Sequence, residues 1–116
     1  MAIALDRAVE ADEIVAALRG YGLTQADTAA AVGVTDRAVR AWSKETRLRR
    51  QHEERLQALR QIVLLIDDSL SPRGVGQWFR AHNRLLGGRR PLDLLAEGDI
   101  DAVRRAAAAF AEGVYT

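Results

Sequence analysis

The strongest constraint on the fold of this 116-residue chain is a segment between Pro72 and Gly98 in which apolar pairs alternate with glycine and proline. Proline is favoured at the first position of a helix, and glycine is favoured just after the last position. The residues that define the segment are, in chain order, Trp78, Phe79, Asn83, Leu85, Leu86, Gly87, Gly88, Pro91, Leu94, Leu95 and Gly98. Their spacing predicts two short helices joined by a fixed turn.

This order of residues resembles the toxin-binding domain of the Xre/MbcA/ParS antitoxin family. The family pattern runs tryptophan, asparagine, leucine, glycine, proline, a leucine pair and a later glycine, and it closes with a glycine, an aliphatic and an aromatic residue. The closing residues here are Gly113, Val114, Tyr115 and Thr116. One position departs from the pattern, because the residue before the asparagine is often proline in the family and is His82 here.

The composition predicts an all-α protein with one compact body. Alanine, leucine and arginine are abundant, only 5% of residues are aromatic, and 28% are charged, which suits helices and argues against a sheet. The absence of cysteine excludes disulfides and cysteine zinc sites and fits a reducing cytoplasm. The longest apolar run, Ile62–Ile66, is far shorter than a membrane span. We therefore expect a cytoplasmic protein with no membrane partner.

A helix-turn-helix is predicted in the first half of the chain. Thr24 is placed to cap a helix that ends at Val32, Gly33 suits a left-handed turn, and Thr35 is placed to cap a second helix. Small residues at Ala29 and Ala30 would let the two helices cross closely, and Val39 and Trp42 would fill the space between them.

Charge is concentrated in the segment that follows the turn. Residues 1–36 carry a net charge of −4, residues 37–60 carry eight basic and three acidic side chains, and residues 61–116 are neutral overall. Binding to duplex DNA requires such a local cluster of cations. The predicted DNA-binding residues are Thr24, Gln25, Thr35, Arg37, Arg40 and Lys44. The alternatives are a solvated helix face and a helix-turn-helix kept only for packing.

Three segments are predicted. Residues 1–48 form the helix-turn-helix module, which includes a first helix over Ala11–Arg19. Residues 49–70 contain a connecting helix from Arg50 to Asp67, whose apolar side chains recur every three or four positions. A short loop anchored by Leu48 precedes that helix. Residues 71–116 form the toxin-binding module, with a last helix from Ile100 to Glu112 and a C-terminal tail.

The family resemblance and the exposed loop positions predict the toxin-binding residues. These are Asn83, Arg84, Leu86, Arg89, Arg90, Glu112, Gly113, Val114, Tyr115 and Thr116. Alternatives stay open for several of them. Asn83 is placed either to shape the turn or to contact a partner, and Arg89 and Arg90 are either solvated or opposite an acidic surface. Val114 and Tyr115 either pack on the chain's own core or enter the nucleotide cleft of a toxin.

The resemblance implies an antitoxin of a type II toxin–antitoxin pair. Its partner would be a RES-domain toxin that consumes NAD, and the helix-turn-helix would bind operator DNA and repress the shared operon. A homodimer, or a larger hetero-oligomer with the toxin, is expected because repressors commonly bind two half-sites. The alternative is a dimeric helix-turn-helix transcriptional regulator with no toxin partner.

Enzymatic chemistry has little support in the sequence. His52 and His82 are far apart, and neither has the carboxylate spacing of a metal site. The chain also lacks a Ser/His/Asp order and a phosphate-binding glycine loop. We therefore expect no enzyme, no metal and no cofactor, and a small helical hydrolase is the weakest of the three alternatives.

Overall fold

The computed structural model describes residues 3–113, which form seven α-helices and two 3₁₀ turns and contain no β-strand. The predicted all-α class is confirmed. The α-helices are α1 (Ala11–Arg19), α2 (Gln25–Val32), α3 (Asp36–Arg40), α4 (Arg50–Asp67), α5 (Pro72–Arg80), α6 (Pro91–Ala96) and α7 (Ile100–Ala111). The 3₁₀ turns are η1 (Leu5–Arg7) and η2 (Arg84–Leu86).

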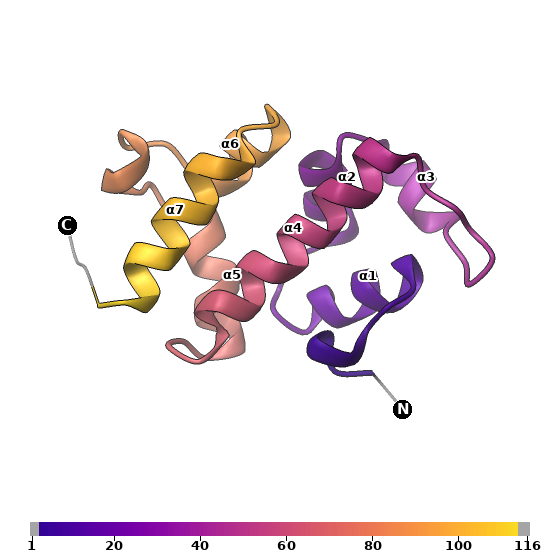
Figure 1. Ribbon diagram of the computed structural model, residues 1–116, viewed down its shortest axis with the longest axis horizontal. Coiled ribbons are helices and arrows are strands. Elements are labelled where there is room, and N and C mark those ends of the chain that lie inside the picture. The colour runs from indigo at the N-terminus through magenta and orange to yellow at the C-terminus, as the bar shows by residue number, and fades with distance from the viewer. Residues whose placement is uncertain (1–2, 114–116) are drawn as a thin grey trace.

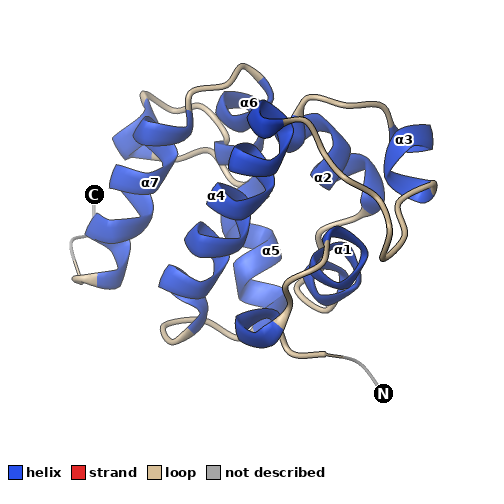
Figure 2. Cartoon of the chain, turned by 45° about the vertical axis from the view of Figure 1, so that its right-hand side comes forward, coloured by secondary structure: helices blue, strands red, loops and turns tan. Residues whose placement is uncertain are grey.

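Helix α4 runs diagonally through the molecule, with α1 to α3 towards one end and α5 to α7 towards the other (Figure 1). It packs against α7, α2, α5 and α1, and Figure 2 shows it between α7 and α1. Most of the apolar side chains predicted on its inner face are buried, including Leu56, Leu59, Val63 and Ile66 at 1% exposure or less, whereas Leu65 is 39% exposed. The observed bounds of α4 are those predicted.

The main hydrophobic core draws on nearly the whole described chain. It joins Ile14 of α1, Leu23, Phe79 of α5 and Val103 of α7, all of which are almost inaccessible to solvent. A second, smaller cluster lies between α1, α2 and α3 and consists of Val15, Ala29 and Val39, covered by Val34 and Trp42. The hydrophobic core therefore extends across the predicted segment boundaries after residues 48 and 70. The division into three segments stays a prediction.

The α2–turn–α3 segment is built by local interactions. The Oγ1 atom of Thr24 accepts the N–H of Asp27 at 3.1 Å, and that of Thr35 accepts the N–H of Ala38 at 3.0 Å. Gly33 takes a left-handed conformation with a φ of +90°. These two caps and this turn match the sequence prediction.

Two details of this segment differ from the prediction. Ala29 and Ala31 are the buried alanines of α2, whereas Ala30 is exposed. Ala29 packs in the cluster with Val39 of α3, and Ala31 packs in the main core. Helix α3 ends at Arg40, and Trp42 follows it as a half-buried side chain outside the helix.

The described residues that precede α1 contain the short turn η1, which packs against the core. Leu5, in η1, is only 3% exposed and belongs to the main core. Arg60 of α4 donates hydrogen bonds to the carbonyl oxygens of Leu5 at 3.0 Å and Asp6 at 2.8 Å. Within the described residues, no helix combines the length and the apolar character needed to cross a membrane.

Candidate functional site

The turn that follows α5 is organised by Asn83. Its Oδ1 accepts the N–H of Leu85 at 2.9 Å, and its carbonyl oxygen accepts the N–H groups of Leu86 and Gly88 at 3.0 and 2.9 Å. Its own N–H donates to the carbonyl oxygen of Arg89 at 3.0 Å. Asn83 therefore holds the two ends of the turn together, as expected if it shapes the turn.

The left-handed residues of this turn are glycines. Asn83 itself is extended, with a φ of −123°, and does not use the left-handed conformation that asparagine can adopt. Gly87 and Gly88 take positive φ values of 67° and 84°, which cost glycine little because it lacks a Cβ atom. His82 lies beside them, and its Nδ1 is 2.8 Å from the carbonyl oxygen of Gly88. Because a carbonyl oxygen only accepts hydrogen bonds, that nitrogen carries the proton.

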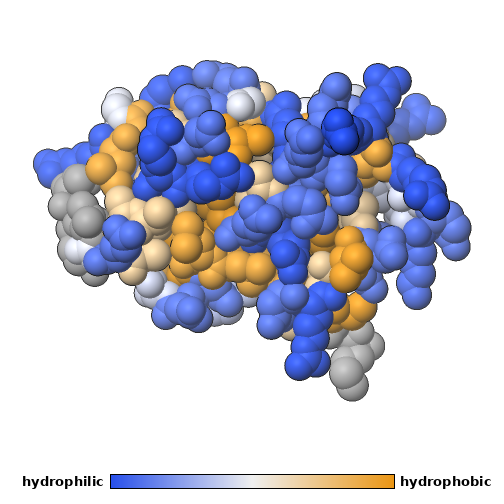
Figure 3. Space-filling model, in the orientation of Figure 1, coloured by the Kyte–Doolittle hydropathy of each residue, from blue (hydrophilic) through white to orange (hydrophobic). Residues whose placement is uncertain are grey.

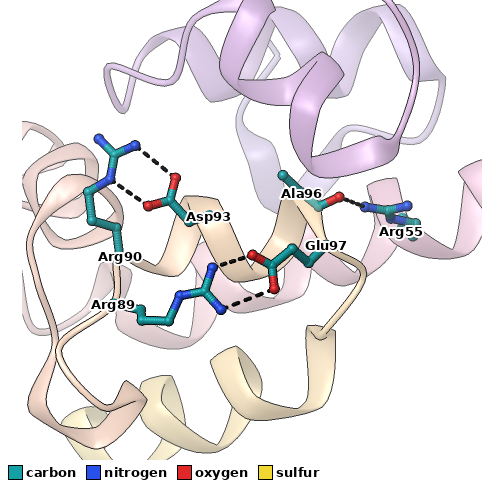
Figure 4. Close-up of polar contacts among 6 residues, drawn as sticks. All are labelled: Arg55, Arg89, Arg90, Asp93, Ala96 and Glu97. Atoms are coloured by element: carbon teal, nitrogen blue, oxygen red, sulfur yellow. Dashed lines mark hydrogen bonds and ion pairs between the residues drawn. The ribbon is translucent and has the colours of Figure 1, made fainter.

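Arg89 and Arg90 form ion pairs within the chain (Figure 4). The guanidinium of Arg90 donates to both carboxylate oxygens of Asp93, at 2.9 and 2.8 Å, and Arg89 donates to both oxygens of Glu97. The hydrogen bond from Arg90 lowers the pKa of Asp93, and that from Arg89 lowers the pKa of Glu97. Neither arginine is therefore a free loop charge, although both pairs face solvent.

The remaining predicted residues of the turn point in different directions. Leu86 is 8% exposed and packs in the main core. Leu85, which is not among the predicted toxin-binding residues, is 42% exposed. Arg84 is exposed and has no ion pair within residues 3–113. The outer surface of the turn is thus formed by Arg84 and Leu85, and a leucine pair alone does not reveal which member faces outward.

The predicted residues at the end of α7 lie partly beyond the described chain. Glu112 is exposed, and Gly113 ends the helix with a φ of +84°. Val114, Tyr115 and Thr116 lie outside the described residues. The end of α7 and the Asn83 turn are both at the end of the molecule opposite α3 (Figure 1).

The predicted DNA-binding residues lie around α2 and α3. Thr24 and Thr35 use their side-chain oxygens as helix caps. Gln25 is half-buried and, with Arg19 and Asp36, lines an open cleft of about 480 Å³ at the start of α2.

The cations predicted on α3 differ in their availability. Arg37 is exposed and has no ion pair within the described residues, whereas Arg40 pairs with Asp36 at 2.8 Å. Lys44 does not share the outer face of α3 with Arg37 and Arg40, which contradicts the prediction. The helix ends four residues earlier, and Lys44 lies in the following turn. The N–H of Ser43 donates to Oγ1 of Thr46 at 2.8 Å, and such side-chain acceptors compete with helical hydrogen bonds.

Comparison with known proteins gives consistent matches over this architecture. Residues 65–113 match the domain described as "Antitoxin Xre/MbcA/ParS C-terminal toxin-binding domain". The matched range begins in the last turn of α4 and includes α5, the Asn83 turn, α6 and α7.

Two relatives are similar over almost their whole length. The "Probable mycobacterial cidal antitoxin Rv3188" of Mycobacterium tuberculosis is 56% identical over 115 residues, which is 99% of each chain. The "Mycobacterial cidal antitoxin MbcA" of Mycobacterium bovis is 29% identical over 108 residues, which is 92% of this chain and 96% of that protein.

A solved structure has a similar fold. It is described as "Crystal structure of the M.tuberculosis MbcT-MbcA toxin-antitoxin complex", and the matched chain has a TM-score of 0.67 and 26% identity to this one. The match covers 85% of this chain and 90% of that chain. Both halves of the fold are therefore included in the similarity.

Proposed function

Because this chain belongs to the Xre/MbcA/ParS antitoxin family, we propose that it neutralises a RES-domain toxin that consumes NAD and represses its own operon. It is an antitoxin of a toxin–antitoxin system and carries a C-terminal toxin-binding domain. The match of residues 65–113 carries the proposal, because this range contains the Asn83 turn with its exposed face. The proposal assigns no catalytic step to this chain.

Toxin binding is proposed for the exposed side chains of Arg84 and Leu85, for the Arg89 and Arg90 ion pairs, and for the residues that follow Gly113 in sequence. The two ion pairs support this, because exposed pairs contribute only about 0–1 kcal/mol and their arginines can turn to a new acidic group at little cost. Leu85, which is 42% exposed, offers an apolar contact on the same turn. Charged groups around such a contact chiefly set orientation and association rate.

Deleting Val114 to Thr116 should abolish protection of cells that express the cognate toxin. Loss of a buried tyrosine anchor costs about 2 kcal/mol or more, which is roughly 30-fold in affinity. Titration calorimetry with the purified toxin measures this change, and growth on co-expression tests protection. A chain carrying Arg73→Ala, distant in sequence from the tail, is the control. Full protection by the truncated chain, at unchanged affinity, would show that the tail is not a toxin contact.

Operon repression is the second part of the proposal. Two capped helices joined by a left-handed glycine, with Arg37 exposed beside them, support it. The alternative of a regulator without a toxin partner gains no support, because the similar proteins are named as antitoxins.

Self-association is the third part of the proposal, and an apolar surface supports it. Gln61, Ile62, Leu64 and Leu65 of α4 form a groove with Arg104 of α7, and Leu65 is 39% exposed. Figure 3 shows apolar surface in this region of the molecule. The large apolar side chain of Phe79 is fully buried and cannot contribute to such a surface.

Light scattering at micromolar concentration should return about twice the monomer mass of 12.7 kDa. Replacing Leu65 by glutamate should return the monomer mass, because a dimer would bury the new carboxylate in an apolar contact. Glutamate at the exposed Val9, in the N-terminal segment, is the control. A wild-type mass of 12.7 kDa would exclude the dimer, and an unaffected Leu65→Glu dimer would exclude this surface.

A further inference from the structure

The segment between α3 and α4 has a defined shape. Its first residues form a turn in which Ser43 accepts the N–H of Thr46 at 3.1 Å, and Ser43 donates its own N–H to the hydroxyl of Thr46. At either side of the turn, Trp42 and Leu48 pack against the main core. Residues 44–50, here called the basic arm, are therefore held against the fold at Leu48.

The basic arm carries four exposed cations, which are Lys44, Arg47, Arg49 and Arg50. None of them takes part in the five ion pairs found within residues 3–113. By contrast, Arg55 and Arg60 of the following helix donate to backbone carbonyl oxygens. Within the described residues, the four cations of the arm thus have neither an ion-pair partner nor a backbone carbonyl acceptor.

Helix stability does not explain these arginines. Arg49 is the N-cap of α4, without a side-chain capping bond, and Arg50 is the first residue of this 18-residue helix. The N-terminus of a helix carries partial positive charge, so a cation there typically costs about 0.3–1 kcal/mol. The same place attracts anions. Both arginines are therefore unfavourable for the isolated fold and favourable for an anionic ligand.

Several carboxylates lie near the arm, most of them outside residues 44–50. The pKa of Glu13 is lowered by backbone hydrogen bonds from Glu10 and Val9 and, to a smaller extent, by the charge of Lys44. Glu10 and Glu53 line a small cavity beside Arg47. Within the arm, Glu45 accepts a hydrogen bond from the hydroxyl of Ser43. Within residues 44–50 four cations face a single carboxylate, that of Glu45, and two of these cations, Arg49 and Arg50, lie at the start of α4.

Helix α3 offers only a small surface for the proposed contact with DNA bases. Its five residues span about 7.5 Å at 1.5 Å per residue. Its Arg40 is engaged by Asp36, which leaves Arg37 as its unpaired cation. One arginine gives about 1–3 kcal/mol of discrimination between bases. A DNA complex would need further affinity from groups outside α3.

We propose that the basic arm is a docking site for the phosphate backbone of duplex DNA. The inference rests on the proposed DNA-binding function and names the surface that supplies its sequence-independent part. Phosphate contacts position a protein on DNA and release counterions, so they weaken steeply with salt. The arm and α3 lie at the same end of the molecule, where Figure 3 shows a hydrophilic surface (Figures 1 and 3).

The test compares two double variants of the full chain, each of which removes two positive charges. Arg47→Ala/Arg49→Ala removes two arm cations, and Arg73→Ala/Arg105→Ala removes two exposed, unpaired arginines of α5 and α7. Fluorescence anisotropy between 50 and 200 mM salt, as an approximate range, measures binding to the upstream duplex and to a scrambled duplex of the same composition. Circular dichroism checks that both variants fold.

The arm variant should bind both duplexes about tenfold more weakly at intermediate salt, and its slope of log affinity against log salt should fall by about 1.8. The control should match the wild type. If the arm variant binds like the control and the wild type still prefers the upstream duplex, the basic arm is not a phosphate-docking site. The proposed operator binding would then still stand. If the wild type binds both duplexes equally and the arm variant binds them more weakly, phosphate docking by the arm is supported. Sequence-specific binding to the operator is then contradicted. If the wild type binds neither duplex, both the docking role of the arm and the proposed DNA-binding function are wrong.

Discussion

Replacing Gly76 by alanine should lower the free energy of unfolding by about 3 kcal/mol, although alanine in a helix normally stabilises by about 1 kcal/mol. A Cβ atom at this buried position would lie 2.4 Å from the carbonyl oxygen of Tyr21. The obstructing atom belongs to the backbone, so it cannot move away by a side-chain rotation. Helix α5 or the α1–α2 connection would have to shift.

Gly74→Ala in the same helix is the matched control. The atoms nearest to its Cβ would be side-chain atoms of Leu70 and Ser71, at 3.3 Å, and its φ is not positive. The helix gain and this tight contact should nearly cancel, which leaves a change within about 1 kcal/mol. Urea unfolding followed by tryptophan fluorescence and circular dichroism measures both variants. Equal stability of the two would show that α5 does not need its close approach to Tyr21.

This close approach joins the toxin-binding domain to the first half of the chain. Arg80, at the end of α5, donates to the carbonyl oxygen of Gly22 and to the carboxylate of Asp27, both at 2.5 Å. Asp27 also accepts the N–H of Thr24, so Arg80 reaches the capping box at the start of α2. A partner that displaces α5 would therefore disturb the helix that begins the proposed DNA-binding segment.

The parts of the fold that could be predicted from the sequence depend on local chemistry. The caps at Thr24, Thr35 and Ser71 each need only a backbone N–H three residues away, and the bounds of α4 follow from its apolar period. Gly33 could be predicted because its conformation is costly for other residues. Such signals lie within a few residues of the structure that they specify.

The parts that could not be predicted depend on contacts between distant segments. The inward turn of Leu86 and the outward turn of Leu85 are set by packing of the 3₁₀ turn against α7. The pairing of Arg89 with Glu97 depends on where α6 ends. For the candidate site, the composition of the Asn83 turn could be predicted, but its outer surface could not.

Arg55 has an important structural role that the sequence pattern does not predict. Its Nε donates to the carbonyl oxygen of Ala31 at 2.9 Å, and its Nη2 donates to that of Leu95 at 2.5 Å. A weaker contact reaches Ala96 at 3.4 Å (Figure 4). These carbonyl groups belong to the last turns of α2 and α6, where partial negative charge favours a cation. One guanidinium thus stabilises two helix ends.

The geometry requires a forked cation. The two helix ends receive different nitrogen atoms of Arg55, and Gly33 gives the guanidinium room, since a Cβ there would lie 2.6 Å from Nη1. Lysine has a single nitrogen on a flexible stem and cannot reproduce such a two-sided contact. Retained charge alone is therefore insufficient to join α2 and α6.

Replacing Arg55 by methionine should lower the free energy of unfolding by between about 2 and 3 kcal/mol, because hydrogen bonds from a charged donor to partly buried carbonyl groups are lost. Arg55→Lys should recover less than half of that loss. Arg60→Met, which removes a guanidinium from the carbonyl groups of η1, is the control for a lost arginine on α4. Hydrogen exchange should show faster opening of the last turns of α2 and α6 in the Arg55 variants alone. Full recovery by lysine would mean that the charge, and not the fork, joins the two helices.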